Sequence, residues 1–118
     1  MKFRTDFVTN SSTSSFIAFA VGAKDKIEIP EDMRDKYGSS ISEYLYDLLP
    51  NKSILSTHTE EYDDEVYLGV EMSQVIKHFG DVQLKDVPQK VVEVINRELR
   101  TDFTVKDVQY VELVSSDR

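Results

Sequence analysis

The sequence predicts a single α+β domain over residues 1–118, on three observations. The length suits one compact domain, and 40% hydrophobic residues are enough to form an ordinary core. Four segments carry the patterns of β-strands, and two longer ones carry the 3.6-residue spacing of amphipathic helices. These segments follow one another in an order that suits an antiparallel sheet with helices on one face.

The first strand is predicted over residues 16–21, where side chains are apolar on both alternating faces. Such a strand is usually central and covered on both sides. Residues 53–59 are rich in β-branched side chains, and residues 65–72 alternate as in a half-buried strand. A last strand is predicted over residues 108–114. Gly69, inside the third strand, indicates a bulge or a close backbone approach; a ligand at this position is the alternative, and the bulge is favoured.

Two longer helices are predicted between the strands. A capping-box pattern at Ser40 opens a helix over residues 41–49. A similar pattern at Asp86 opens a helix over residues 88–100, which carries a regular apolar stripe. Shorter helical segments are predicted over residues 30–37 and 73–79, the second with Ile76 and Phe79 meeting at one face.

The order strand, helix, strand, strand, helix, strand matches the ferredoxin-like, or split βαβ, plan. In that two-layer sandwich both helices cover one face of a four-stranded antiparallel sheet; a different α+β arrangement is the main alternative. The other apolar face of the first strand then needs a cover, because large bare apolar patches are rare on soluble monomers. We therefore expect residues 1–8 to fold back as an extra strand, or a second copy of the protein to cover this face. Residues 115–118 are expected to form a frayed end.

The N-terminal segment 1–15 has a pattern of its own. Residues 5–16 read TDFVTNSSTSSF, and residues 9–15 are all Ser, Thr or Asn. This segment resembles an N-terminal signature of small proteins of Gram-positive bacteria and their mobile elements. The resemblance covers about the first sixteen residues and implies no particular activity. The polar run is interpreted as a solvated loop, with a recognition or phosphorylation site as the alternative.

Composition excludes several classes of site. The chain has no cysteine, so disulfides, thiolate metal sites and a cysteine nucleophile are excluded. A net charge of -8 disfavours nucleic acid and anionic membranes as direct partners. The apolar run 16–23 follows Lys2 and Arg4, as in a secretory signal. A buried strand is favoured because a long polar stretch separates these two positive charges from the apolar run. The predicted location is the cytoplasm.

Motifs for catalysis or cofactor binding are not found in the sequence. The four glycines are too far apart for a phosphate-binding loop, and the two histidines have no metal-binding spacing. We therefore predict no catalytic residues, no cofactor-binding residues and no cofactor. Acidic residues that could bind Mg²⁺ or Ca²⁺ cluster near His58, although a solvated hairpin tip is favoured; they are Glu60, Glu61, Asp63 and Asp64.

The function favoured by the sequence is a non-catalytic protein-interaction or regulatory module with a protein partner or a second copy of itself. Five aromatic residues are predicted to carry the interaction: Phe7, Phe16, Phe19, Tyr67 and Tyr110. The two tyrosines would form an aromatic platform if both lay on the open face of the sheet. One alternative function is an acidic nucleic-acid mimic that inhibits a DNA-binding enzyme; another is a small metal-dependent hydrolase.

Overall fold

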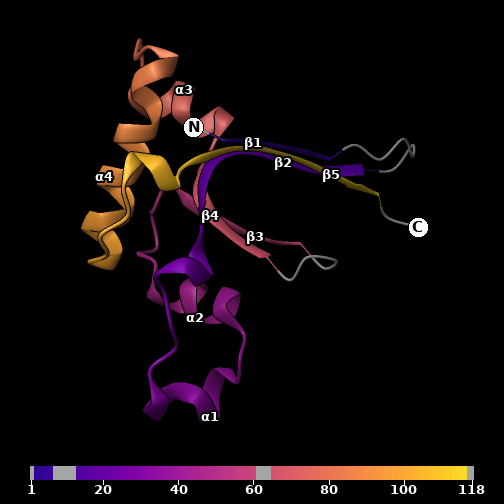
Figure 1. Cartoon of the computed structure of the whole chain (residues 1–118), viewed down its shortest axis with the longest axis vertical. Coiled ribbons are helices and arrows are strands. Elements are labelled where there is room, and N and C mark those ends of the chain that lie inside the picture. Colours follow the sequence, from indigo (N-terminus) through magenta and orange to yellow (C-terminus); the bar gives the residue numbers. More distant parts are fainter. Residues whose placement is uncertain (1, 7–12, 61–64, 117–118) are drawn as a thin grey trace.

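The computed structural model describes residues 2–6, 13–60 and 65–116, which form a five-stranded sheet and four α-helices (Figure 1). The strands are β1 (Lys2–Asp6), β2 (Thr13–Gly22), β3 (Leu55–Glu60), β4 (Glu65–Glu71) and β5 (Gln109–Ser116). The helices are α1 (Arg34–Tyr37), α2 (Ile41–Leu48), α3 (Met72–Phe79) and α4 (Val87–Leu99).

The strands are arranged in the order β1-β5-β2-β4-β3. Each neighbouring pair among β5, β2, β4 and β3 is antiparallel, which confirms an α+β protein with a four-stranded antiparallel sheet. β1 pairs in parallel with β5, so the predicted extra N-terminal strand is present over Lys2–Asp6. Because β1 extends the edge of the sheet, it does not cover the face of β2 as we expected; another element must do so.

The sheet bends so strongly that it folds over itself. His58 lies opposite Tyr67, and Tyr67 lies opposite Gly22 in the strand register. Phe16 is six residues from Gly22 along β2, about 20 Å in an extended strand. The rings of Phe16 and His58 nevertheless stack with their centroids 5.1 Å apart. The arm made by β1, β5 and the first half of β2 therefore lies across from the β3–β4 hairpin (Figure 1).

A small core fills the space between these two arms. Its six residues are each at most 5% exposed: Phe16, Ala18, Ala20, Tyr67, Val111 and Leu113. The second apolar face of β2 is thus covered by the opposite arm of its own sheet. The same packing buries β4 on both faces, where the alternating pattern predicted a half-buried strand.

Gly69 allows β2 and β4 to meet closely at the bend. A Cβ atom at this position would lie 2.1 Å from the backbone oxygen of Phe19 and 2.6 Å from the Cβ of Ala20. The β2–β4 register runs through Gly69 without interruption. The favoured prediction of a bulge was therefore wrong, and the close backbone approach is confirmed.

The main core lies on the other face of the sheet, beneath the helices. α4 packs against β2 and β4, and α2 packs against β3. The central side chains are fully buried, among them Phe19 and Leu68 from the sheet and Val91 and Ile95 from α4. These two helix residues belong to the apolar stripe that the sequence predicted.

Three local predictions were wrong. In α3 the buried residue is Val75, and Ile76 is 69% exposed, because Met72, Val75 and Phe79 form the packed face at spacings of three and four. Asp86 makes no side-chain cap, since its backbone is already helical where a 3₁₀ turn continues into α4. Residues 115 and 116, expected to fray, pair with β2.

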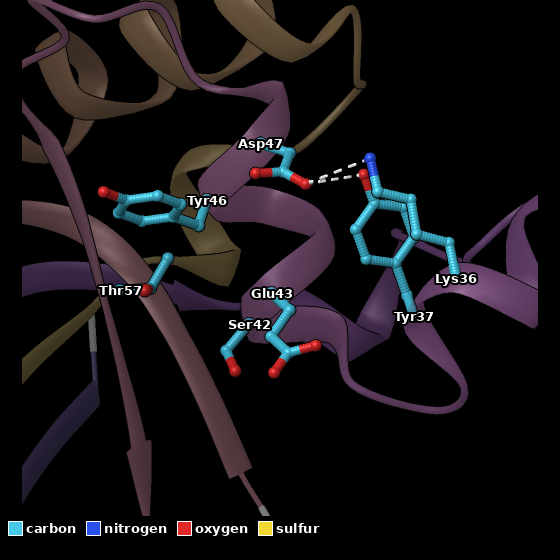
Figure 2. Close-up of a pocket in the computed structure, with 7 residues that line it drawn as sticks. All are labelled: Lys36, Tyr37, Ser42, Glu43, Tyr46, Asp47 and Thr57. Atoms are coloured by element: carbon cyan, nitrogen blue, oxygen red, sulfur yellow. Dashed lines mark hydrogen bonds and ion pairs between the residues drawn. The ribbon is translucent and has the colours of Figure 1, made fainter.

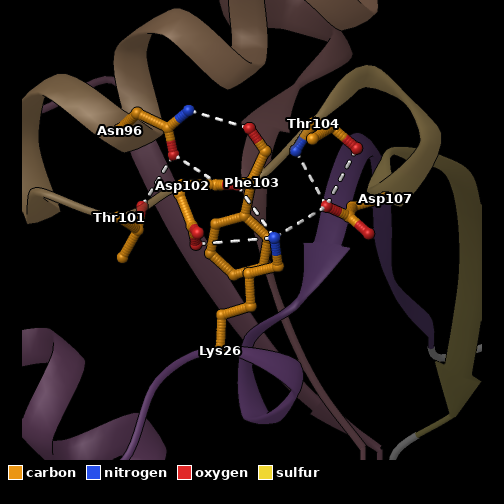
Figure 3. Close-up of polar contacts among 7 residues, drawn as sticks. All are labelled: Lys26, Asn96, Thr101, Asp102, Phe103, Thr104 and Asp107. Carbon is orange, nitrogen blue, oxygen red and sulfur yellow. Dashed lines mark hydrogen bonds and ion pairs between the residues drawn. The ribbon is translucent and has the colours of Figure 1, made fainter.

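The connection from α4 to β5 is held by the side chain of Asn96. Its amide nitrogen donates to the Phe103 carbonyl at 2.9 Å. Its oxygen accepts from the Phe103 amide at 2.9 Å and from the Thr101 hydroxyl at 2.8 Å (Figure 3). These bonds close the chain behind the helix and fix Phe103, which is 3% exposed, in the main core.

Lys26 joins this connection to the segment that follows β2. Its ammonium group donates to the Asp102 carbonyl at 2.8 Å and lies 3.8 Å from the Asp107 carboxylate (Figure 3). The same group lies 5.7 Å from the centre of the Phe103 ring. Asp107 also accepts from the Thr104 amide at 2.8 Å, which begins the turn before β5. The link therefore ties together parts of the chain far apart in sequence.

The cross-strand pair Ser56–Gly69 allows a test with opposite expected signs. Gly69→Ala should lower the free energy of unfolding by about 3 kcal/mol or more, because the new methyl group meets backbone that cannot move aside. Ser56→Ala should leave stability unchanged or raise it by about 1 kcal/mol, since its buried hydroxyl has no hydrogen-bond partner. Urea unfolding measures both. Equal effects of the two substitutions would contradict the proposed bend.

Asn96 provides a graded test of the α4–β5 connection. Asn96→Ala removes three hydrogen bonds and should cost about 2 kcal/mol. Asn96→Asp keeps the acceptor, but at neutral pH it places a carboxylate oxygen against the Phe103 carbonyl, which repels it. At pH 3 the carboxyl group is protonated and can donate, so the cost should be smaller than that of Asn96→Ala. Thermal unfolding of both variants at pH 3 gives the order, and an Asp variant no more stable than the Ala variant there would show that these bonds contribute little.

Candidate functional site

β3 is an edge strand whose outer side pairs with no other strand in the described ranges 2–6, 13–60 and 65–116. Its sequence, LSTHTE, contains neither Lys nor Pro, the residues that often prevent pairing at an exposed edge. An edge of this kind can accept an extended segment of another chain by strand addition. The β3 edge is therefore the first candidate for an interaction surface.

The backbone groups available at this edge follow from the ladder. The Leu55 amide donates to the Ser53 hydroxyl at 3.0 Å, so it is directed away from β4. In an antiparallel pair, residues alternate between those bonded to the partner strand and those directed away from it. The amide and carbonyl groups of Thr57 and Thr59 are accordingly directed outward with those of Leu55.

A groove of about 450 Å³ lies beside this edge, between α2 and β3 (Figure 2). It is lined by Thr57 from β3, by Lys36 and Tyr37 from α1, and by four residues of α2: Ser42, Glu43, Tyr46 and Asp47. Tyr46 is 80% exposed, the most exposed of the large apolar side chains in the described chain. We call this surface, the groove with the outer side of β3, the β3 groove.

One end of the β3 groove is held by contacts between α1 and α2. The Tyr37 hydroxyl donates to the Asp47 carboxylate at 2.7 Å, and the Lys36 ammonium lies 3.7 Å from the same carboxylate (Figure 2). Lys36 also lies 5.1 Å from the centre of the Tyr37 ring. Tyr37 and then Asp47 raise the pKa of Lys36 above its usual value, so the ammonium stays charged. The rings of Tyr37 and Tyr44 meet edge to face.

A smaller cavity of about 240 Å³ lies between α2 and the end of α4. Its lining includes Lys26, Arg100 and the apolar side chains Leu48 and Leu99. The Lys26 ammonium is already bonded to the α4–β5 connection. Among the described residues, the β3 groove is therefore the better candidate for binding.

The aromatic residues predicted to carry an interaction are mostly core residues in this structure. Phe19 is fully buried in the main core, and Phe16 and Tyr67 are 3% exposed in the small core. Tyr110 packs edge to face on Phe19, on the opposite face of the sheet from Tyr67. The two tyrosines therefore form no common platform. Phe7 lies outside the described residues.

The predicted metal ligands are not brought together in the described part of the chain. Glu61, Asp63 and Asp64 lie outside the described residues, and Glu60 ends β3. His58 is partly buried and stacks on Phe16. No group of three or more His, Asp or Glu side chains within the described ranges is placed to hold a metal ion. In the same ranges, no helix is long and apolar enough to pass through a bilayer.

The residues that line the β3 groove were not singled out by sequence reasoning. The helical spacing of apolar residues in α2 was visible in the sequence at Ile41, Tyr44, Leu45 and Leu48. The first three are buried, whereas Leu48 is 45% exposed. Tyr46 is a large aromatic residue outside this apolar stripe. Its position was the one sequence signal that an aromatic side chain of this helix is exposed. Its proximity to Thr57 depends on how α2 packs against β3, which no local pattern reports.

Comparisons of the chain with protein-family models, with curated proteins and with solved structures found no match. The resemblance of the first sixteen residues therefore stays a prediction.

Tyr110 provides a test of the pH dependence. Burial, followed by the negative charge of Glu112, raises the pKa of Tyr110, whose hydroxyl lies 3.3 Å from that carboxylate. The folded state thus holds this proton more tightly than the unfolded state, and the associated stability is lost as the pH rises above about 10. Urea unfolding from pH 8 to 11 should show a steeper loss for the wild type than for Tyr110→Phe. Parallel curves would contradict the assignment.

Proposed function

We propose that this protein is a non-catalytic interaction module that binds an extended segment of a protein partner by strand addition at the β3 groove. The observation that carries the proposal is an edge strand whose outer side pairs with no described strand, lying beside a groove that contains a largely exposed tyrosine. Backbone hydrogen bonds to the outward groups of β3 would supply affinity, and the groove would select side chains.

Two further features support this function. Tyrosine is enriched at the centres of protein interfaces, because it supplies a large contact area and a polar end with little conformational entropy to lose. One end of the β3 groove is held in place by the bond between Tyr37 and Asp47, and α2 is fixed by its buried side, so little ordering would be needed on binding.

We also propose that the fold follows the ferredoxin-like plan with one added strand. Two observations support it: β2 and β3 are parallel with β4 between them, and β4 and β5 are parallel with β2 between them. Each pair is joined through helices, as in a split βαβ unit. In such a plan the outer strand β3 is free to accept a further strand.

A peptide-display selection tests the proposed function. Peptides enriched on the wild-type protein should bind Thr57→Val with similar affinity and Thr57→Pro at least about tenfold more weakly, since proline removes the outward donor and obstructs strand pairing. Circular dichroism checks that both variants remain folded, as proline is tolerated at strand edges. Enriched peptides that bind both variants equally, or a selection that enriches no peptide, would refute strand addition at β3.

A further inference from the structure

The charges of the β3 groove are unbalanced. Two residues with carboxylates, Glu43 and Asp47, and one with an ammonium group, Lys36, line it. Asp47 is already bonded to Tyr37 and lies near Lys36, whereas the exposed Glu43 side chain makes no ion pair with a described residue. A cation that entered the groove would therefore find a carboxylate available.

Glu43 and Tyr46 both line the groove but at different places, since the Tyr46 ring lies on the side of Thr57 and the Glu43 carboxylate is directed away from it (Figure 2). A carboxylate attracts the ammonium group of Lys or the guanidinium group of Arg, and an aromatic face attracts the same groups. The two side chains therefore favour basic residues at different positions of a bound segment. In a strand added to β3, every second side chain would face the same side as Thr57, toward the groove. The site therefore fits basic residues that recur at alternate positions.

A second copy of this chain is a poorer occupant. Its own edge strand, LSTHTE, contains no Lys or Arg to place near Glu43. Antiparallel pairing of β3 with β3 of another copy would also bring the two Glu43 residues to the same interface. Each copy carries a net charge of -8, which adds repulsion over longer distances.

We propose that the partner segment is an extended basic peptide with Lys or Arg at alternate positions, recognised by Glu43 and Tyr46. This inference rests on the proposed function, since it requires strand addition at β3. It adds the chemical class of the partner.

The test uses three synthetic six-residue peptides in which threonine alternates with Lys, Gln or Glu. Binding to the full chain is followed by NMR titration of amide signals at 50 and 300 mM salt. The Lys peptide should bind at least about tenfold more tightly than the Gln peptide at low salt, with the largest shifts in β3 and α2. This ratio should fall at high salt, because the charges near the surface are screened.

Two matched variants separate a local charge effect from a global one. Glu43→Gln should reduce the preference for the Lys peptide at least about threefold, and Glu93→Gln, on the exposed side of α4, should leave it unchanged. Tyr46→Leu should weaken the Lys peptide more than the Gln peptide, because the apolar contact is kept while the aromatic face is lost.

The outcomes distinguish the two proposals. Equal binding of the Lys and Gln peptides at β3, or equal effects of Glu43→Gln and Glu93→Gln, would overturn the basic partner and leave strand addition intact. Failure of all three peptides to shift the β3 signals would overturn both proposals. A dimer found by sedimentation, and abolished by Thr57→Pro, would replace the basic peptide with a second copy.

Discussion

The close approach of β2 and β4 at Gly69 is the constraint on which the rest of the structure depends. With the backbone of Phe19 and the methyl group of Ala20 so near, no side chain fits at this position. Ala18 and Ala20 keep the same face small. Together they allow the sheet to bend until its two arms meet, and the aromatic rings of Phe16 and Tyr67 fill the space that remains. The smallest side chains therefore lie at the bend and the largest lie away from it.

The bend also decides where the β3 groove lies. β2 pairs with β4 only over its last residues, Ala18–Gly22. The rest of the β3–β4 hairpin is therefore not hydrogen-bonded to β2 and forms the second arm of the bent sheet. β3 is left at the outer edge of that hairpin, with its outward backbone groups unpaired by any described strand. The buried residues Ile41 and Leu45 fix α2 against the main core, and this placement directs Tyr46 toward the edge. The groove is thus a consequence of the way both cores are packed.

Local sequence patterns predicted which segments form helices and strands, but they predicted less well which side chains of those segments are buried. The spacing in α4 located its buried stripe, because a helix that packs on one face carries a period that survives in the sequence. The alternation in β4 located a strand but not its burial, since Tyr67 is buried by residues of β2 and β5 that are remote in sequence. The extra strand β1 was predicted correctly, although the reason given for it was wrong: the apolar face of β2 is covered by the bend. Sheet curvature and groove geometry depend on long-range contacts, which periodicity does not report.

The acidity of the chain acquires a physical role at this edge. An unpaired strand without Lys or Pro is exposed to pairing between copies, which often leads to aggregation. Here the charge of -8 on every copy opposes such encounters at a distance, where screening by salt is incomplete. The same field would attract the basic segment that we propose toward the groove lined by Glu43 and Tyr46. The same negative charge can thus oppose self-association at the open edge and favour a partner of opposite sign. A neutral chain would have to cover this edge to prevent self-association, and the edge would then be closed to a partner as well.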